Sequence, residues 1–158
     1  MIAETCYLEV LVDAAKEVFE TMIFMTVDDN PEVDCVEGDA LLGSITFKGE
    51  LEGCMSICCG KDDATLIAAT MLGMEPEDGL AEEDIRDAMG EIANMVMGSV
   101  KARLLENGLS NLDVSIPCVV SGKELSSSLG DSAVQIKKVV CIDECPAELM
   151  LLYRSKES

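Results

Sequence analysis

Two stretches of the chain repeat apolar residues at helical spacing, with polar residues between them. The first predicts a long amphipathic helix from residue 5 to about 28, ended by the polar segment 28–31. The second predicts a shorter helix over residues 64–72, for which Gly73 suits the C-terminal cap. The apolar stripe of the first helix consists of Leu8, Leu11, Val12, Ala15, Val18, Phe19, Met22 and Ile23.

Several shorter stretches read as strands bounded by turn residues. Residues 39–48 and 51–59 predict a hairpin that turns at Lys48-Gly49. Residues 113–116 and 118–121 predict strand on either side of Pro117, which interrupts backbone pairing and marks a sheet edge or a bulge. After a polar segment at 121–132, two more strands are predicted, and their ranges are 133–143 and 147–153.

A third helix is predicted from residue 80 to about 107, and its two faces differ sharply. The face expected to lie on the core carries Ile85, Met89, Ile92, Val96 and Val100. The opposite face carries Asp87, Glu91, Asn94, Gly98 and Lys101.

Consecutive strands without intervening helices favour an antiparallel sheet. The predicted fold class is therefore α+β, with a single antiparallel sheet of about six strands and long helices packed on one face. At 158 residues the chain is predicted to form one domain, spanning 1–158.

The polar face of the third helix combines a carboxylate with an amide. Glu91 and Asn94 lie three residues apart, so their Cβ atoms are expected to be about 5 to 6 Å apart and both side chains can reach one small target. Gly90 and Gly98 flank the pair, and each costs about 1 kcal/mol in a helix interior relative to alanine. Both are predicted on the exposed side, where close approach by a partner would explain them. The simpler interpretation is that this face is only solvated.

These residues carry a family resemblance. The pattern Asp87-x3-Glu91-x2-Asn94-x22-Pro117 resembles the [DS]-x3-E-x2-N-x22-P signature of the chemotaxis phosphatases CheC, CheX and FliY. The likeness extends over roughly residues 1 to 150. CheC carries two such centres and CheX carries one. In this chain the first helix offers only Asp13-x3-Glu17-x2-Glu20, with Gly43 where the proline would stand, so the chain most resembles CheX.

The resemblance implies an activity and a partner. The family dephosphorylates the phospho-aspartate of a CheY-like receiver domain. It implies that Asn94 orients the attacking water and that Glu91 contacts a lysine of the receiver. Asp87 would have a secondary contact or helix-start role, and Pro117 would be little more than a strand terminator. No cofactor of its own is expected, because the receiver would hold the magnesium ion, and a homodimer formed through strands of the second half is also implied.

Composition narrows the classes of partner. The formal net charge is -20, which disfavours binding to nucleic acid or an anionic membrane, since phosphates would be repelled. The sequence has no apolar run near the roughly 20 residues that span a bilayer and no basic start typical of a signal peptide, so a cytoplasmic protein is expected.

The eight cysteines are expected to be free thiols, most of them among apolar neighbours. Cys54 with Cys58, and Cys141 with Cys145, are expected to share a strand face. This spacing is not that of a zinc ribbon, so no metal site is predicted. The chain has no histidine, which excludes a Ser-His or Cys-His catalytic triad. Two alternatives to the phosphatase remain: a non-catalytic module that binds a receiver or a flagellar-switch component, and a thiol or metal sensor.

Overall fold

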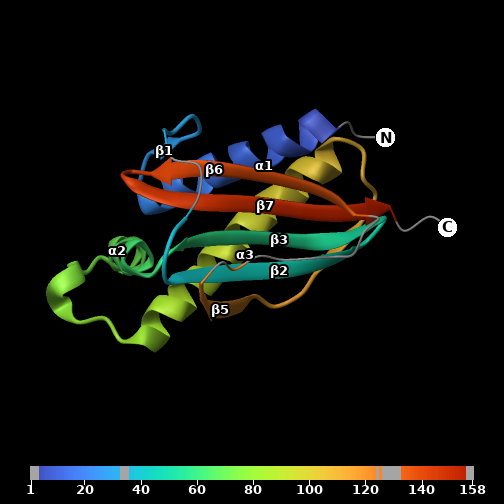
Figure 1. Cartoon of the computed structure of the whole chain (residues 1–158). Coiled ribbons are helices and arrows are strands. Elements are labelled where there is room, and N and C mark those ends of the chain that lie inside the picture. Colours follow the sequence, from blue (N-terminus) through green and yellow to red (C-terminus); the bar gives the residue numbers. More distant parts are fainter. Residues whose placement is uncertain (1–3, 33–35, 124, 126–132, 156–158) are drawn as a thin grey trace.

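The computed structural model describes residues 4–32, 36–123, 125 and 133–155. They form an open antiparallel sheet of seven strands with helices α1 and α3 side by side on one face and α2 at one end (Figure 1). The predicted α+β class and one-sided helical layer are confirmed. The helices are α1 (Glu4–Val18), α2 (Lys61–Leu72) and α3 (Glu82–Glu106), with a π-helical turn η1 (Phe19–Ile23) and a 3-10 turn η2 (Pro76–Asp78). The strands are β1 (Val27–Asp28), β2 (Ala40–Gly49), β3 (Leu51–Gly60), β4 (Leu112–Val114), β5 (Cys118–Gly122), β6 (Val134–Ile142) and β7 (Cys145–Ser155).

The sheet order is β1-β6-β7-β3-β2-β4, and β5 also pairs with β2. Strands β4 and β5 therefore share one edge of the sheet, and both lie against the outer side of β2. The break between them contains Pro117, which has no N–H to donate to a ladder. The prediction that Pro117 marks an interruption at a sheet edge is confirmed.

The seventh strand arises where a helix was predicted. The helical segment formed by α1 and η1 ends at Ile23 rather than near residue 28, because Phe24 turns the chain with a φ of 66°. The carboxylate of Glu20 accepts a hydrogen bond from Val27 N (3.0 Å), and the backbone of β1 pairs with β6. An open ladder edge on β6 gives this short segment backbone partners that only the tertiary fold supplies.

The core lies between the sheet and the two long helices. Tyr7 on α1 and Tyr153 on β7 stack with ring centroids 4.1 Å apart. Helix α3 buries its predicted apolar stripe, including Met89 and Ile92. It packs closely on the sheet at Gly43 on β2, where an added Cβ would lie 3.2 Å from the carbonyl oxygen of Met89. Missing side-chain bulk at Gly43 thus lets α3 sit directly on β2.

The two cysteine pairs behave differently. Cys54 and Cys58 lie on one face of β3, as expected. Cys141 and Cys145 do not share a strand face, because the chain turns between them and places one in β6 and the other in β7. The cysteines of the described residues are free thiols, whereas Cys35 and most of the polar segment 121–132 lie outside the described residues.

Candidate functional site

Helix α3 presents a polar face on the side away from the sheet. Glu91 and Asn94 are both exposed there, and so is Asp87 one turn earlier. None of the three makes a hydrogen bond or ion pair with the described part of the chain, although the helix that carries them is anchored by its buried stripe. The helix therefore fixes the backbone positions of the two residues, and their side-chain polar atoms are unused within the described part of the chain.

A surface hollow of about 440 Å³ lies beside this face. Its lining combines residues of α3 with residues of the edge segment: Arg86, Asp87, Gly90, Glu91, Pro117 and Val119. The wall formed by α3 carries the carboxylates of Asp87 and Glu91 and the guanidinium of Arg86, and the opposite wall is apolar. Asn94 does not line the hollow and lies on the next turn of the same exposed face. The structure thus brings Asp87, Gly90, Glu91 and Pro117 together around one hollow.

Gly90 does not lie where the helical wheel placed it. It is buried, and an added Cβ would lie 3.6 Å from both Pro117 Cγ and Val119 Cγ2. The neighbour that approaches Gly90 closely is therefore the chain's own edge segment and not a partner. Gly98, in contrast, is exposed, with no atom of another side chain or element within 4 Å of an added Cβ. Its surroundings are open, as the wheel predicted.

Arg86 fastens the two walls of the hollow, and sequence reasoning missed it. Its guanidinium donates hydrogen bonds to the carbonyl oxygen of Val119 (3.0 Å) and to Ser121 Oγ (2.8 Å) on β5. These bonds hold the edge strand against α3. The only signal in the sequence was an arginine next to Asp87, because its bonding partners lie more than thirty residues away.

The partial second motif on α1 is occupied by structural contacts. Glu17 accepts hydrogen bonds from Ser99 Oγ (3.0 Å) and Arg103 Nη2 (2.9 Å), which join α1 to α3. Glu20 is bonded to Val27 N. A carboxylate stands where the signature has asparagine, and both acidic groups have partners within the chain. This agrees with the prediction of one centre.

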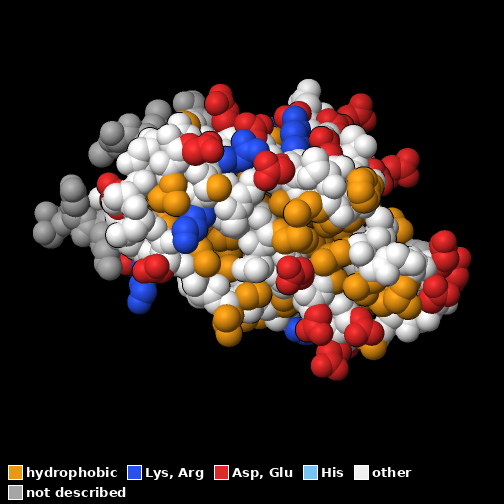
Figure 2. Space-filling model, turned by 180° about the vertical axis from the view of Figure 1, so that it is seen from behind, with side chains coloured by type: hydrophobic (Ala, Val, Ile, Leu, Met, Phe, Trp, Pro, Cys, Tyr) orange, Lys and Arg blue, Asp and Glu red, His pale blue; other side chains and the backbone are white. Residues whose placement is uncertain are grey.

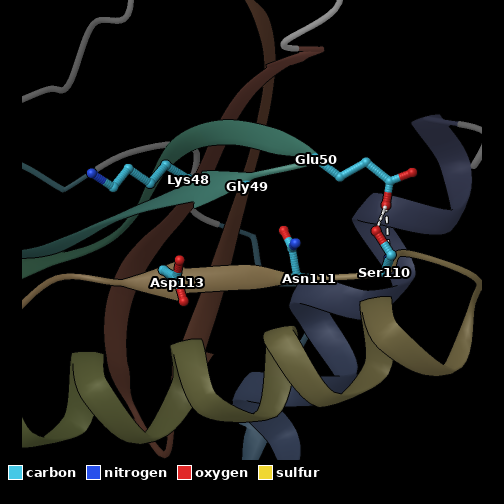
Figure 3. A pocket seen from close by; sticks show the side chains of 6 residues that line it. All are labelled: Lys48, Gly49, Glu50, Ser110, Asn111 and Asp113. Carbon is cyan, nitrogen blue, oxygen red and sulfur yellow. Dashed lines mark hydrogen bonds between the residues drawn. The ribbon is translucent and has the colours of Figure 1, made fainter.

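A second hollow, of about 500 Å³, lies near the far end of α3, between the β2–β3 turn and the segment before β4 (Figure 3). Glu50 accepts hydrogen bonds from Ser110 N (2.7 Å) and Ser110 Oγ (3.0 Å), and these bonds hold the pKa of its carboxyl below the usual value. Among the side chains that line this hollow, the carboxylate of Glu50 is thus used to fasten the loop at Ser110. Among the described residues no group of three or more acidic, cysteine or histidine side chains is placed to hold a metal ion.

The whole helical face has a distinctive surface. Apolar side chains gather over the middle of this face, and most acidic side chains lie around its outline, with a few acidic groups among the apolar ones (Figure 2). The described helices include none with the length and apolar character needed to cross a bilayer.

Comparison with known proteins places the chain in a family. A family model described as "Chemotaxis phosphatase CheX" matches residues 41–139, which include α3 with Glu91 and Asn94 and the segment with Pro117. The chain belongs to the CheX family. A search of curated protein sequences found no match.

Solved structures agree with this assignment. The chain is 29% identical to the chemotaxis protein CheX from Vibrio vulnificus, with a TM-score of 0.79 over 96% of this chain and 97% of that one. It is 25% identical to a CheC-like superfamily protein from Shewanella sp. PV-4, with a TM-score of 0.80 over 97% and 100%. The fold also matches the Borrelia burgdorferi protein in a CheX–CheY–BeF3–Mg2+ complex, at 20% identity and a TM-score of 0.72 over 94% and 98%.

Proposed function

We propose that this CheX-family protein hydrolyses the phospho-aspartate of a CheY-like receiver domain, with α3 docked across the phosphorylation site. The observation that carries the proposal is the unpaired Glu91 and Asn94 pair on the exposed face of a firmly anchored helix. The Borrelia complex of the same fold, which contains CheY, BeF3 and Mg2+, supports the choice of partner. The expected magnesium ion belongs to the receiver.

An acyl phosphate already has a good leaving group, so its hydrolysis needs mainly a water molecule in line with phosphorus and control of charge. The water oxygen attacks phosphorus, the bond between phosphorus and the aspartate oxygen breaks, and the products are inorganic phosphate and a free carboxylate. The side-chain amide of Asn94 has both a donor and an acceptor, so it can orient this water without being a base. Asn94 is exposed and makes no hydrogen bond within the described residues, so the N–H donor and the oxygen acceptor of its side-chain amide are both available.

Glu91 has a different task. Its carboxylate would be repelled by the phosphoryl group but would pair with a lysine ammonium of the receiver. Glu91 and Asp87 together outweigh the one cation of the hollow's lining, Arg86, whose guanidinium is already bonded to β5, so the hollow favours a further cation. We assign docking to Glu91 and water orientation to Asn94, and Asp87 adds negative charge at the same wall.

The decisive experiment measures the decay of a magnesium-loaded phospho-receiver with wild-type protein and with Asn94→Ala. We expect the wild type to accelerate decay and Asn94→Ala to lose about a hundred-fold or more of that acceleration, because the water is no longer held in line. Asn94 is exposed, so the thermal stability of the variant should stay near that of the wild type.

The docking role has a matched control on the same helix. Glu91→Gln should raise KM for the phospho-receiver, whereas Glu106→Gln, an exposed glutamate in the last turn of α3, should leave KM unchanged. An Asn94→Ala protein with full activity would contradict the assignment. Binding of a receiver by the wild type with no acceleration would instead favour the alternative of a non-catalytic receiver-binding or flagellar-switch module.

A further inference from the structure

Ile116 is the most exposed of the large hydrophobic side chains that the structure describes, at 87%. It directly precedes Pro117, which forms the apolar wall of the hollow that Glu91 also lines. An isoleucine this exposed gains nothing from the chain's own core. Single exposed apolar residues are common on protein surfaces, so what distinguishes Ile116 is its position next to the candidate site.

The backbone on the N-terminal side of Ile116 is fixed by a reciprocal pair of bonds. Ser115 N donates to the carbonyl oxygen of Thr46 (2.9 Å), and Thr46 N donates to Ser115 Oγ (3.0 Å). Ser115 Oγ also donates to the carbonyl oxygen of Ile116 (3.0 Å). Thr46 of β2 and Ser115, the residue after β4, thus fix the segment just before the exposed side chain.

The C-terminal side is fixed as well. The Pro117 ring restricts its own backbone and packs over Gly90, and Arg86 holds the carbonyl oxygen of Val119 at 3.0 Å. Ile116 is consequently an apolar side chain on a rigid base. A backbone held in place before binding loses little conformational entropy when a partner covers its side chain, which makes Ile116 a favourable anchor.

The position of Ile116 also decides which partner would cover it. Neighbouring Cα atoms are about 3.8 Å apart, so Ile116 lies one residue from the wall that faces Glu91. A standard interface covers roughly 800 Å² per partner, equivalent to a disc of about 16 Å radius. A protein that docks on Glu91 and Asn94 with an interface of this size, and that extends over the Pro117 wall of the hollow, also reaches Ile116.

We propose that Ile116 is an apolar anchor for the receiver domain, and that it inserts into an apolar depression of the receiver beside the cation that pairs with Glu91. This inference rests on the proposed function and adds a specificity-determining residue to it. A partner would be recognised by two features at a set spacing, a cation and an apolar depression. A receiver with a polar side chain in place of the depression would bind more weakly.

The test measures binding separately from catalysis. The affinity of the cognate CheY-like receiver, loaded with Mg2+ and BeF3, is determined by calorimetry for wild type, Ile116→Ser and Ile116→Leu. We expect Ile116→Ser to raise Kd about ten-fold, as is typical for a central apolar anchor, and Ile116→Leu to stay within about two-fold of wild type. At saturating phospho-receiver, Ile116→Ser should keep a kcat within about two-fold of wild type.

Leu105→Ser is the control. Leu105 is also an exposed apolar residue, at 37%, but it lies in the last turn of α3, about 16 Å along the helix axis beyond Asn94 and farther still from Glu91. Its Kd should equal that of the wild type. Light scattering of each free variant tests whether Ile116 instead joins two copies of this chain.

The outcomes separate this inference from the proposed function. An unchanged Kd for Ile116→Ser, with an Asn94→Ala protein that is inactive, would overturn the anchor and leave the phosphatase standing. A loss of self-association in Ile116→Ser without a change in receiver affinity would also overturn it. A wild type that neither binds nor dephosphorylates any cognate receiver would overturn both.

Discussion

Glycine shows how much a single residue's surroundings decide its role. Gly90 and Gly98 lie on the same helix, and both carry the same intrinsic helix penalty. Gly90 is buried under Pro117 and Val119, whereas Gly98 faces open space. The helical wheel predicted an exposed position for both, and only their neighbours in the fold make one buried and the other exposed.

Gly98→Ala is predicted to raise the free energy of unfolding by about 0.5 to 1 kcal/mol, because the helix gains propensity and the new methyl group meets nothing. Chemical denaturation measures this gain.

The Gly98→Ala variant also tests for close approach by a partner at this turn. If the receiver's backbone comes within contact distance of Gly98, the stabilised protein will have a higher KM, and an unchanged KM would show that no such approach occurs.

Gly53→Ala provides the opposite control for stability. An added Cβ there would lie 1.9 Å from the carbonyl oxygen of Leu152, which belongs to the neighbouring strand backbone. This variant should be strongly destabilised, since strand β7 cannot move away from β3 without loss of ladder bonds.

Among the secondary-structure elements, the edge strand β5 depends most clearly on bonds to its neighbours. Its side chains are mostly exposed or half-buried, so burial alone binds it weakly to the rest of the fold. Pairing with β2 and the two bonds from Arg86 fasten it. The apolar wall of the hollow therefore depends on an arginine whose guanidinium is bonded to the chain's own edge strand.

Arg86→Ala is predicted to destabilise the protein by about 1 to 3 kcal/mol, the range for loss of hydrogen bonds to a charged donor. We expect a raised KM for the phospho-receiver as the wall that carries Pro117 loosens. Arg86→Lys should recover only part of the effect, because an ammonium cannot make the same forked pair of bonds. Hydrogen exchange of β5 amides distinguishes this role from a direct contact with the receiver: it should accelerate in Arg86→Ala and remain at the wild-type rate in Glu91→Gln.

The buried thiols affect the stability of the whole molecule. Burial raises the pKa of the Cys58 thiol to about 11 and that of Cys145 to about 12, with nearby acidic groups acting in the same direction. Cys59 is shifted upward too, chiefly by burial, so its pKa lies above the usual value of a thiol. These thiols are neutral in the folded protein at neutral pH, which agrees with their place among apolar neighbours.

The shifts predict alkaline instability. A raised pKa in the folded state means that the native protein holds the proton more tightly than the unfolded chain. The resulting stability is fully present below pH 9 and is lost as pH rises towards about 11 to 12. Denaturation midpoints at a series of pH values should fall over this window, and replacement of Cys58 by alanine should reduce the fall. A midpoint independent of pH between 9 and 11 would contradict the argument.

The sequence determined much of the local structure and the candidate chemistry. The apolar stripe of α3, the hairpin at Gly49, the cap at Gly73 and the exposed Glu91 and Asn94 all follow from periodicity and turn chemistry, which act over a few residues. The resemblance to the CheX family rests on a motif whose acidic and amide residues are local along α3, followed by Pro117 in the edge segment, and the family model matches residues 41–139. The predicted homodimer, the cytoplasmic location and the magnesium ion on the receiver remain predictions.

Tertiary structure alone decided the features that depend on residues distant in the chain. The end of the first helix is one, because β1 forms only where β6 offers an unpaired backbone. The burial of Gly90 under Pro117 and the bonds from Arg86 to β5 are others. Periodicity shows which face of a helix is polar, but it cannot show which distant segment packs over part of that face. The helix carries the candidate chemistry, and the packed edge strand gives the site its shape.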